Sequence, residues 1–180
     1  HSYSSAASDV YKRQVQENYK CKKPFVIYNY FSSNLDNKII NNSNKIKINQ
    51  NSELTFLEYN ISEKSKFIKN TFEDIEIKDN SVLKSIIIQK TKSNGYFYKS
   101  VAASQGYNST FQNFILSSGL EFNKLDQSIS LSKENGTCFI LSGLSLGENE
   151  HQEIKTQINH FAPNCKSYQK IKNVLDGGSH

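Results

Sequence analysis

The sequence predicts an all-β fold, and three observations predict it. Short runs of β-branched and aromatic residues recur along the chain, several with alternating sides, as where Leu54, Phe56 and Glu58 share one face. Dense turn chemistry, rich in Asn, Ser and Gly, separates these runs. No segment sustains the apolar spacing of a helix over three turns.

Ten strands are predicted in chain order. They are Phe25–Tyr30, Lys45–Asn49, Leu54–Asn60, Lys66–Ile77, Val82–Gln89, Tyr96–Val101, Thr110–Leu116, Leu125–Leu131, Thr137–Leu141 and Ile154–His160. The run Lys66–Ile77 is expected to break near Asn70. Ser167–Leu175 could place Tyr168, Ile171 and Leu175 on one helical face, but it also alternates as a strand does, and the strand is favoured. Turns are predicted at residues 78–81, 93–95, 105–108, 117–119, 133–136 and 147–149.

A sandwich, a barrel and a β-solenoid all fit strands with this spacing. The Asn-Gly pairs at 94–95 and 135–136 lie within longer loops, whereas a sandwich usually has two-residue hairpins at such pairs. The chain has 21 Asn and 25 Ser, and both suit solenoid corners, where their side chains bond neighbouring backbone and can stack between coils. An AT-rich genome would also enrich Lys, Asn and Ile, so composition favours the solenoid only modestly.

Composition and charge exclude several classes of protein. The net charge of +5 comes from dispersed Lys, with Arg13 as the only Arg, which argues against a nucleic-acid reader. The apolar runs are too short for a membrane helix, and residues 1–20 hold no signal-peptide core. The three Cys form neither a disulfide framework nor a CxxC pair, so the expected compartment is a reducing cytoplasm.

The two ends of the chain differ from its body. Residues 1–14, HSYSSAASDVYKRQ, hold two of the five Ala and are interpreted as a non-native or disordered leader, which leaves residues 15–180 as the core. The chain lacks Met and ends in Asp176-Gly177-Gly178-Ser179-His180, with no predicted helix cap or closing strand. We therefore expect a fragment truncated at both ends, whose last coil exposes unpaired strand edges and favours aggregation.

Catalytic motifs are missing from the sequence. It holds no GxxxxGK[ST], GxSxG, HExxH or GxGxxG pattern. Two acidic clusters could supply paired carboxylates for polysaccharide chemistry, namely Glu73, Asp74 and Glu76, and then Glu148, Glu150 and Glu153 beside His151. The body lacks the Arg and Trp that usually line sugar grooves, so these carboxylates are interpreted as solvated strand faces.

His160 and Cys165 are the candidate metal residues. Separated by a Pro-containing turn, they could meet as a soft metal site or a thiolate–imidazolium pair. Two ligands do not make a stable zinc site. We expect structural roles instead, with Cys165 packed inward as a small apolar group and His160 bonded to a neighbouring carbonyl.

Residues 143–176, GLSLGENEHQEIKTQINHFAPNCKSYQKIKNVLD, closely resemble the core of the SufB/SufD family of iron–sulfur cluster assembly proteins. The matching residues are Gly143, Leu144, Gly147, Thr156, Ile158, His160, Ala162, Pro163, Cys165, Ser167, Gln169, Lys170, Leu175 and Asp176. Upstream, residues 51–59 and the Lys23-Pro24 start of an apolar strand also resemble the family. Glu153 and Lys155 stand where the family often has an acidic residue and a His, so a role of that His does not carry over.

The resemblance implies a right-handed parallel β-helix and a SufD-like core, with SufB as the other option. It further implies a scaffold subunit of the SufBCD complex that pairs with a SufB-like paralogue and a SufC-like ATPase. The expected ATP hydrolysis then belongs to SufC, and this chain is not an enzyme. No cofactor is expected in this chain, because an iron–sulfur cluster forms only at the level of the assembled complex, and the residues that bind cluster and SufC are expected beyond His180.

Two other functions remain open at this stage. A secreted carbohydrate-active β-helix enzyme would need an export signal and an acidic or Arg-bearing groove. A structural or adhesive solenoid would need export and regular short repeats.

Overall fold

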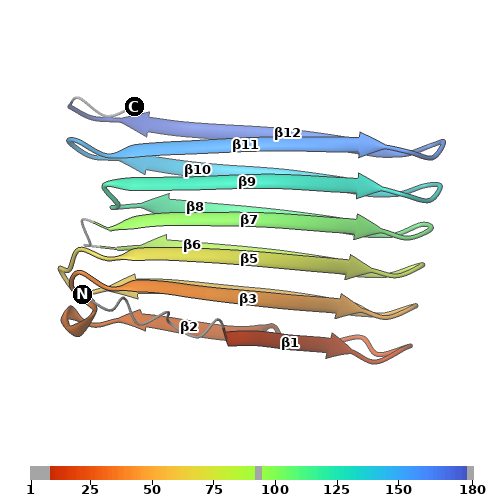
Figure 1. Cartoon of the computed structure of the whole chain (residues 1–180). Helices are drawn as coiled ribbons and strands as arrows, with labels where there is room; N and C mark the ends of the chain where they lie inside the picture. Colours follow the sequence, from red (N-terminus) through yellow and green to blue (C-terminus); the bar gives the residue numbers. More distant parts are fainter. Residues whose placement is uncertain (1–8, 92–94, 178–180) are drawn as a thin grey trace.

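The computed structural model describes residues 9–91 and 95–177, and in them the chain winds as a parallel β-solenoid of about six turns (Figure 1). Strands alternate between two parallel six-stranded sheets. Sheet A has the order β1-β3-β5-β7-β9-β11 and sheet B the order β12-β10-β8-β6-β4-β2. Because both sheets are parallel throughout their described strands, the antiparallel sandwich and the up-and-down barrel are excluded.

The bounds of the elements follow the winding of the chain. They are β1 (Asp9–Val15), β2 (Phe25–Phe31), the 3₁₀ turn η1 (Ser33–Leu35), β3 (Ile39–Ile48), β4 (Glu53–Ser62), β5 (Ile68–Ile77), β6 (Val82–Lys90), β7 (Tyr96–Gln105), β8 (Thr110–Ser118), β9 (Phe122–Leu131), β10 (Thr137–Leu146), β11 (His151–His160) and β12 (Lys166–Leu175). No helix in the described ranges is long and apolar enough to cross a membrane.

The predicted strands are found at the expected places in the chain, but several of them are longer than predicted. All ten predicted strands and the favoured strand at Ser167–Leu175 are present, but β5 runs through Asn70 without a break. Asn70 is tolerated because its amide donates a 2.8 Å hydrogen bond to Asn41 of the neighbouring strand. Part of the predicted turn at 93–95 lies outside the described residues.

The predicted leader is ordered in its second part. Asp9–Val15 forms β1, which pairs in parallel with β3 from Asn42 to Ile48. Residues 9–14 therefore belong to the solenoid and are not disordered. Residues 1–8 of the leader lie outside the described residues.

A ladder of asparagine residues lies at the corner where the chain passes from each strand of sheet A to the next strand of sheet B. Its members share a positive φ of 50–61° and are Asn18, Asn51, Asn80, Asn108, Asn135 and Asn164. Side-chain amides join Asn18, Asn51, Asn80 and Asn108 one above the other at 2.9–3.2 Å. Asn accepts this left-handed conformation more readily than other side-chain-bearing residues, so the chain's Asn content has a structural use at these corners.

The interior has an apolar part on each side of a polar middle. Next to the asparagine ladder lies the main cluster, in which Ile48, Ile77, Leu83 and Phe111 are fully buried. Toward the opposite corner lies a second cluster of Phe31, Phe67, Phe97 and Leu120. Buried polar side chains occupy the space between the two clusters, and they include the network described below.

Candidate functional site

Cys165 occupies a structural position of the corner. It follows Asn164 as Ser52, Ser81 and Ser109 follow their ladder asparagines. Its thiol donates to the carbonyl of Lys133 at 3.4 Å, just as the Ser81 hydroxyl donates to the carbonyl of Asn49 at 2.6 Å. Cys165 also packs against the main apolar cluster. The thiol thus takes the place that a serine hydroxyl holds in earlier coils.

His160 ends β11 and aligns with Leu131 of β9. The side chain is exposed at the end of the solenoid, and its Nε2 lies 3.1 Å from the hydroxyl of Ser167 on β12. The bond is therefore to a hydroxyl, where a carbonyl was expected. Within residues 9–91 and 95–177, no group of three or more His, Cys, Asp or Glu side chains could hold a metal ion.

The carboxylates of the first acidic cluster lie on opposite faces of β5. Asp74 and Glu76 point outward and pair with Lys45 at 3.2 Å and Lys47 at 3.4 Å. Glu73 points inward and is 2% exposed, so the expectation of a solvated face is wrong for this residue.

In the second cluster, the three carboxylates again do not converge. Glu153 pairs with Lys124 at 3.1 Å, and Glu150 accepts a hydrogen bond from the backbone N–H of Gly147. Glu148 is exposed. Glu153 thus belongs to an ion pair and Glu150 to a turn, and the three carboxylates form no paired acid–base site.

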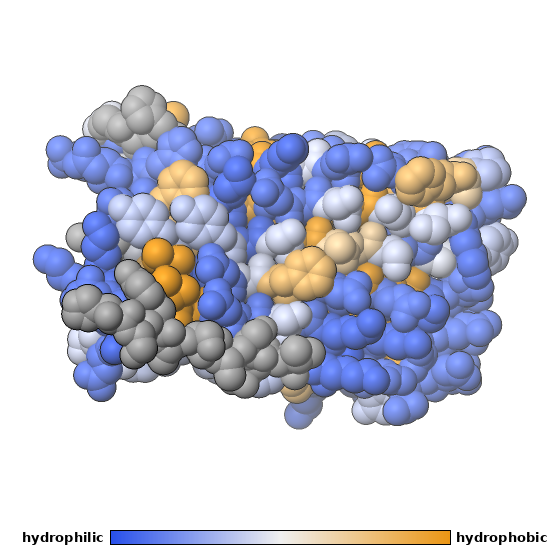
Figure 2. Space-filling view, in the orientation of Figure 1, coloured by the Kyte–Doolittle hydropathy of each residue, from blue (hydrophilic) through white to orange (hydrophobic). Residues whose placement is uncertain are grey.

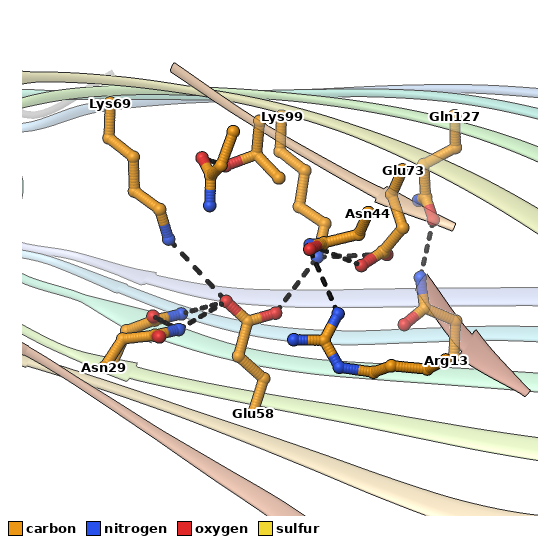
Figure 3. A network of polar contacts seen from close by, with 12 residues as sticks. Arg13, Asn29, Asn44, Glu58, Lys69, Glu73, Lys99 and Gln127 are labelled. Carbon is orange, nitrogen blue, oxygen red and sulfur yellow. Dashed lines mark hydrogen bonds and ion pairs between the residues drawn. The ribbon is translucent and has the colours of Figure 1, made fainter. Parts of the chain in front are cut away.

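A buried charged network of Glu58, Lys69, Glu73 and Lys99 is the main cluster of ionisable groups inside the solenoid (Figure 3). The alternation of side chains along each strand places these charged residues inside the solenoid. Glu58 lies on the inner face of β4 that also carries Leu54 and Phe56, and Glu73 on the inner face of β5 with Ile75 and Ile77. Each charge is thus carried inward by its apolar neighbours on the same strand.

Glu58 is the centre of the network. Its carboxylate lies 3.7 Å from the Lys69 ammonium and 3.2 Å from that of Lys99, and Figure 3 shows both lysines pointing toward it. The amides of Asn29 and Asn60 donate to the same carboxylate at 3.2 and 3.0 Å. Every oxygen of this buried carboxylate therefore has a partner, as a buried charge requires.

Lys99 joins the two carboxylates, because it also contacts Glu73 at 3.1 Å. Glu73 in turn accepts from Asn44, and Asn44 accepts from Arg13 of β1 at 3.1 Å. Further along the axis the interior polar groups are uncharged, as where Asn113 donates to Gln127 at 2.6 Å. The charges are balanced within the network, two positive against two negative.

The pKa values follow from this geometry. Burial alone would raise the pKa of Glu58, but the ammonium groups of Lys99 and Lys69 and the hydrogen bond from Asn60 outweigh it and lower the pKa to about 2. Burial would lower the pKa of Lys99, yet the two facing carboxylates raise it above its ordinary value. Lys69 differs, because burial lowers its pKa more than Glu58 at 3.7 Å can restore.

Lys69 also lies between aromatic rings. Its ammonium is 5.0 Å from the centre of the Phe31 ring and 5.3 Å from that of Phe97, within the range of cation–π attraction. A cavity of about 350 Å³ opens beside it, lined among others by Arg13, Asn29 and Glu58. Because the charged groups are engaged with each other, the network is suited to cross-linking strands rather than to acid–base chemistry.

Sequence reasoning missed this network, although one signal was present. Glu58 shares its face with Leu54 and Phe56, and a carboxylate on an apolar face needs a buried cation. The cation could not be located from the sequence, because Lys99 lies 41 residues after Glu58 and reaches it only through the stacking of coils.

Comparison with protein families identifies the solenoid. Residues 30–180 match the family model described as "SUF system FeS cluster assembly, SufBD core domain". The match covers the solenoid from the end of β2 through β12, including the His160–Cys165 corner and the buried charged network. A search of curated proteins gives no match.

Proposed function

Because the chain belongs to the SufB/SufD family of the SUF system for iron–sulfur cluster assembly, we propose that it is a SufD-like scaffold subunit of a SufBCD complex. The observation that carries the proposal is the match of the SufBD core domain over residues 30–180, the same residues that form most of a parallel β-solenoid. SufB is the other member that shares this core, and the experiment below separates the two.

In this proposal the chain is a rigid core and not an enzyme. The partners are a SufB-like paralogue and a SufC-like ATPase, and ATP hydrolysis belongs to the latter. The iron–sulfur cluster is the cargo of the assembled complex, and no residue of this chain is proposed as its ligand. The structural roles of His160 and Cys165 support this division, since both residues are engaged in bonds of the corner.

The proposal includes a cytoplasmic location. Cys21, Cys138 and Cys165 are free thiols, which suits a reducing compartment. Cell fractionation of the source organism, followed by immunodetection of this chain, tests the location. Recovery in a membrane or exported fraction would overturn this part.

Co-purification tests the proposed complex. The gene product that contains this chain is expressed with a tag, together with the SufB-like and SufC-like proteins of the same genome. The expected result is one complex that holds all three proteins and gains the visible absorption of an iron–sulfur cluster after reconstitution. A chain that replaces SufB in pairing with a SufD-like protein would assign it to SufB, and failure to retain either partner would overturn the proposal.

A further inference from the structure

The two outer faces of the solenoid differ in character. On sheet A, cross-strand ion pairs lie along the outer face, among them Lys45–Asp74 at 3.2 Å and Lys124–Glu153 at 3.1 Å. An apolar row of Ile39, Ile68, Tyr96 and Phe122 lies at one end of these strands. Figure 2 views the molecule as Figure 1 does, with sheet A in front, and shows a largely hydrophilic face with several separate apolar groups. This is the composition expected of a face that meets water.

The outer face of sheet B carries an apolar stripe instead. One row of the stripe crosses five strands in register, as Val26, Leu57, Ile86, Phe114 and Leu141. In β4, β6, β8 and β10 these residues alternate with buried ones and so point outward, and Val26 of β2 is paired with the outward Leu57. None of the five is buried.

A second row runs beside the first. It consists of Tyr28, Tyr59, Ile88 and Leu116, again paired strand to strand. The Tyr28 side chain is 70% exposed and that of Leu116 47%. We call the two rows the sheet B stripe. A continuous apolar surface of this length on a solvent-facing sheet marks an interaction site.

Lysines outnumber acidic residues around the stripe, where Glu63 accepts a hydrogen bond from Tyr30 of β2. The lysines on this face are Lys84, Lys90, Lys166, Lys170 and Lys172, and the single acidic residue among its outward strand positions is Glu53, which pairs with Lys84 at 3.5 Å. A partner that covers the stripe therefore gains from acidic residues at its edges. A second copy of this chain would bring its own lysines against these, which disfavours self-association through the stripe.

The stripe has the dimensions of a helix lying across the strands. Neighbouring strands are about 4.8 Å apart and an α-helix rises about 5.4 Å per turn, so one helical turn meets each strand. Five strands span about 19 Å, which a helix of about 13 residues covers at about 1.5 Å per residue. Residues at i, i+3, i+4 and i+7 of such a helix would fall on the two apolar rows.

We propose that the sheet B stripe docks an amphipathic helix of a partner protein, apolar on one face and acidic along its edges, lying across β2, β4, β6, β8 and β10. The apolar contacts supply affinity, and the lysines select the acidic partner and its orientation.

Two synthetic peptides test the proposal. Both are 14-residue helix formers with the same Leu face; one carries Glu at the edges, and the other carries Lys at the same positions. Fluorescence anisotropy of the labelled peptides is measured against the whole chain at low and moderate salt. The Glu peptide is expected to bind at least tenfold more tightly than the Lys peptide, and added salt should reduce the difference.

Substitutions locate the binding. Leu116→Glu should weaken binding of the Glu peptide at least tenfold, and Lys170→Glu should weaken it while strengthening binding of the Lys peptide. The matched control is Phe72→Glu, since Phe72 is 48% exposed on the outer face of sheet A and should leave binding unchanged. Circular dichroism and thermal melting confirm that each variant folds.

Several results would overturn the proposal. Equal binding of the two peptides, no binding of the Glu peptide, or equal losses in Leu116→Glu and Phe72→Glu would each do so. A dimer in sedimentation that Leu116→Glu dissolves would assign the stripe to a second copy. Binding to anionic phosphatidylserine vesicles that the same substitution abolishes would assign it to a lipid surface.

Discussion

Replacing Glu58 by Gln removes the negative charge between Lys69 and Lys99 while keeping the shape of the side chain. The variant leaves Lys69 without its carboxylate partner and Lys99 with Glu73 alone. Because the network lies between two apolar clusters, the two ammonium groups lose a buried counter-charge.

Two independent arguments give the size of the loss in unfolding free energy expected for Glu58→Gln. The fall in the pKa of Glu58 from 4.5 to about 2 corresponds to about 3 kcal/mol of folding free energy at neutral pH, at about 1.4 kcal/mol per pKa unit. Removing one partner of a buried ion pair in other proteins costs about 3–5 kcal/mol. We therefore expect Glu58→Gln to lower the free energy of unfolding by about 3 kcal/mol.

The loss should depend on pH in a defined direction. The pKa of Glu58 is lower in the folded state, so its stabilising effect is complete above pH 4.5 and disappears as the pH falls toward 2. Urea unfolding followed by circular dichroism at pH 6, 5, 4 and 3.5 measures both proteins. The difference between wild type and Glu58→Gln should be largest at pH 6 and shrink below pH 4.5.

Two further variants complete the experiment. Glu58→Gln combined with Lys69→Met leaves the balanced Lys99–Glu73 pair and should recover part of the loss. The control is Glu76→Gln, whose carboxylate pairs with the partly exposed Lys47, at 3.4 Å, and Lys78, and it should cost less than about 1 kcal/mol. Equal effects of Glu58→Gln and Glu76→Gln, or a loss independent of pH, would refute the reasoning.

Three shorter predictions concern the corner and the cysteines. Cys165→Ser should change the free energy of unfolding by less than about 0.5 kcal/mol and leave cluster assembly intact, because serine holds this place in other coils; loss of assembly with normal folding would contradict the structural role. Asn80→Ala should cost about 1–3 kcal/mol in urea unfolding, from its φ of 56° and its lost amide bonds, and Asn80→Gly less. Burial raises the pKa of Cys138 to about 12, so native iodoacetamide labelling read by mass spectrometry should spare Cys138 and modify Cys165; early labelling of Cys138 would contradict its burial.

The fold was predictable to the level of strands and corners. Alternation located the strands, since one side of each meets a continuous core, and the abundance of Asn suited the left-handed corners. The coil period is also visible in the sequence, in the repeated pairs Asn51-Ser52 and Asn80-Ser81. Strand ends were underestimated because parallel pairing continues into polar stretches such as residues 41–44, where side-chain bonds between coils replace apolar packing.

The buried network and β1 were beyond the reach of local patterns. Glu58 and its lysines are set in contact by the register of the coils, and alternation along one strand carries no information about that register. β1 was missed because residues 9–15 contain few apolar residues and an unusual composition. Its place in sheet A depends on seven residues of pairing with β3, which only the assembled solenoid provides.

The network also bears on how the solenoid unfolds. In a repeat protein each coil contacts only its neighbours, so opening should spread inward from the ends with gradually rising free energy. Lys99 of β7 contacts both Glu58 of β4 and Glu73 of β5, and therefore ties together strands of successive coils. We expect amide hydrogen exchange to give β4, β5 and β7 one common opening free energy in the wild type. In Glu58→Gln the protection of β4 should separate from that of β7 and fall first, because its ionic link to the later coil is gone. Protection that declines smoothly toward the ends in both proteins would show that the charged network adds no cooperativity beyond the contacts between adjacent coils.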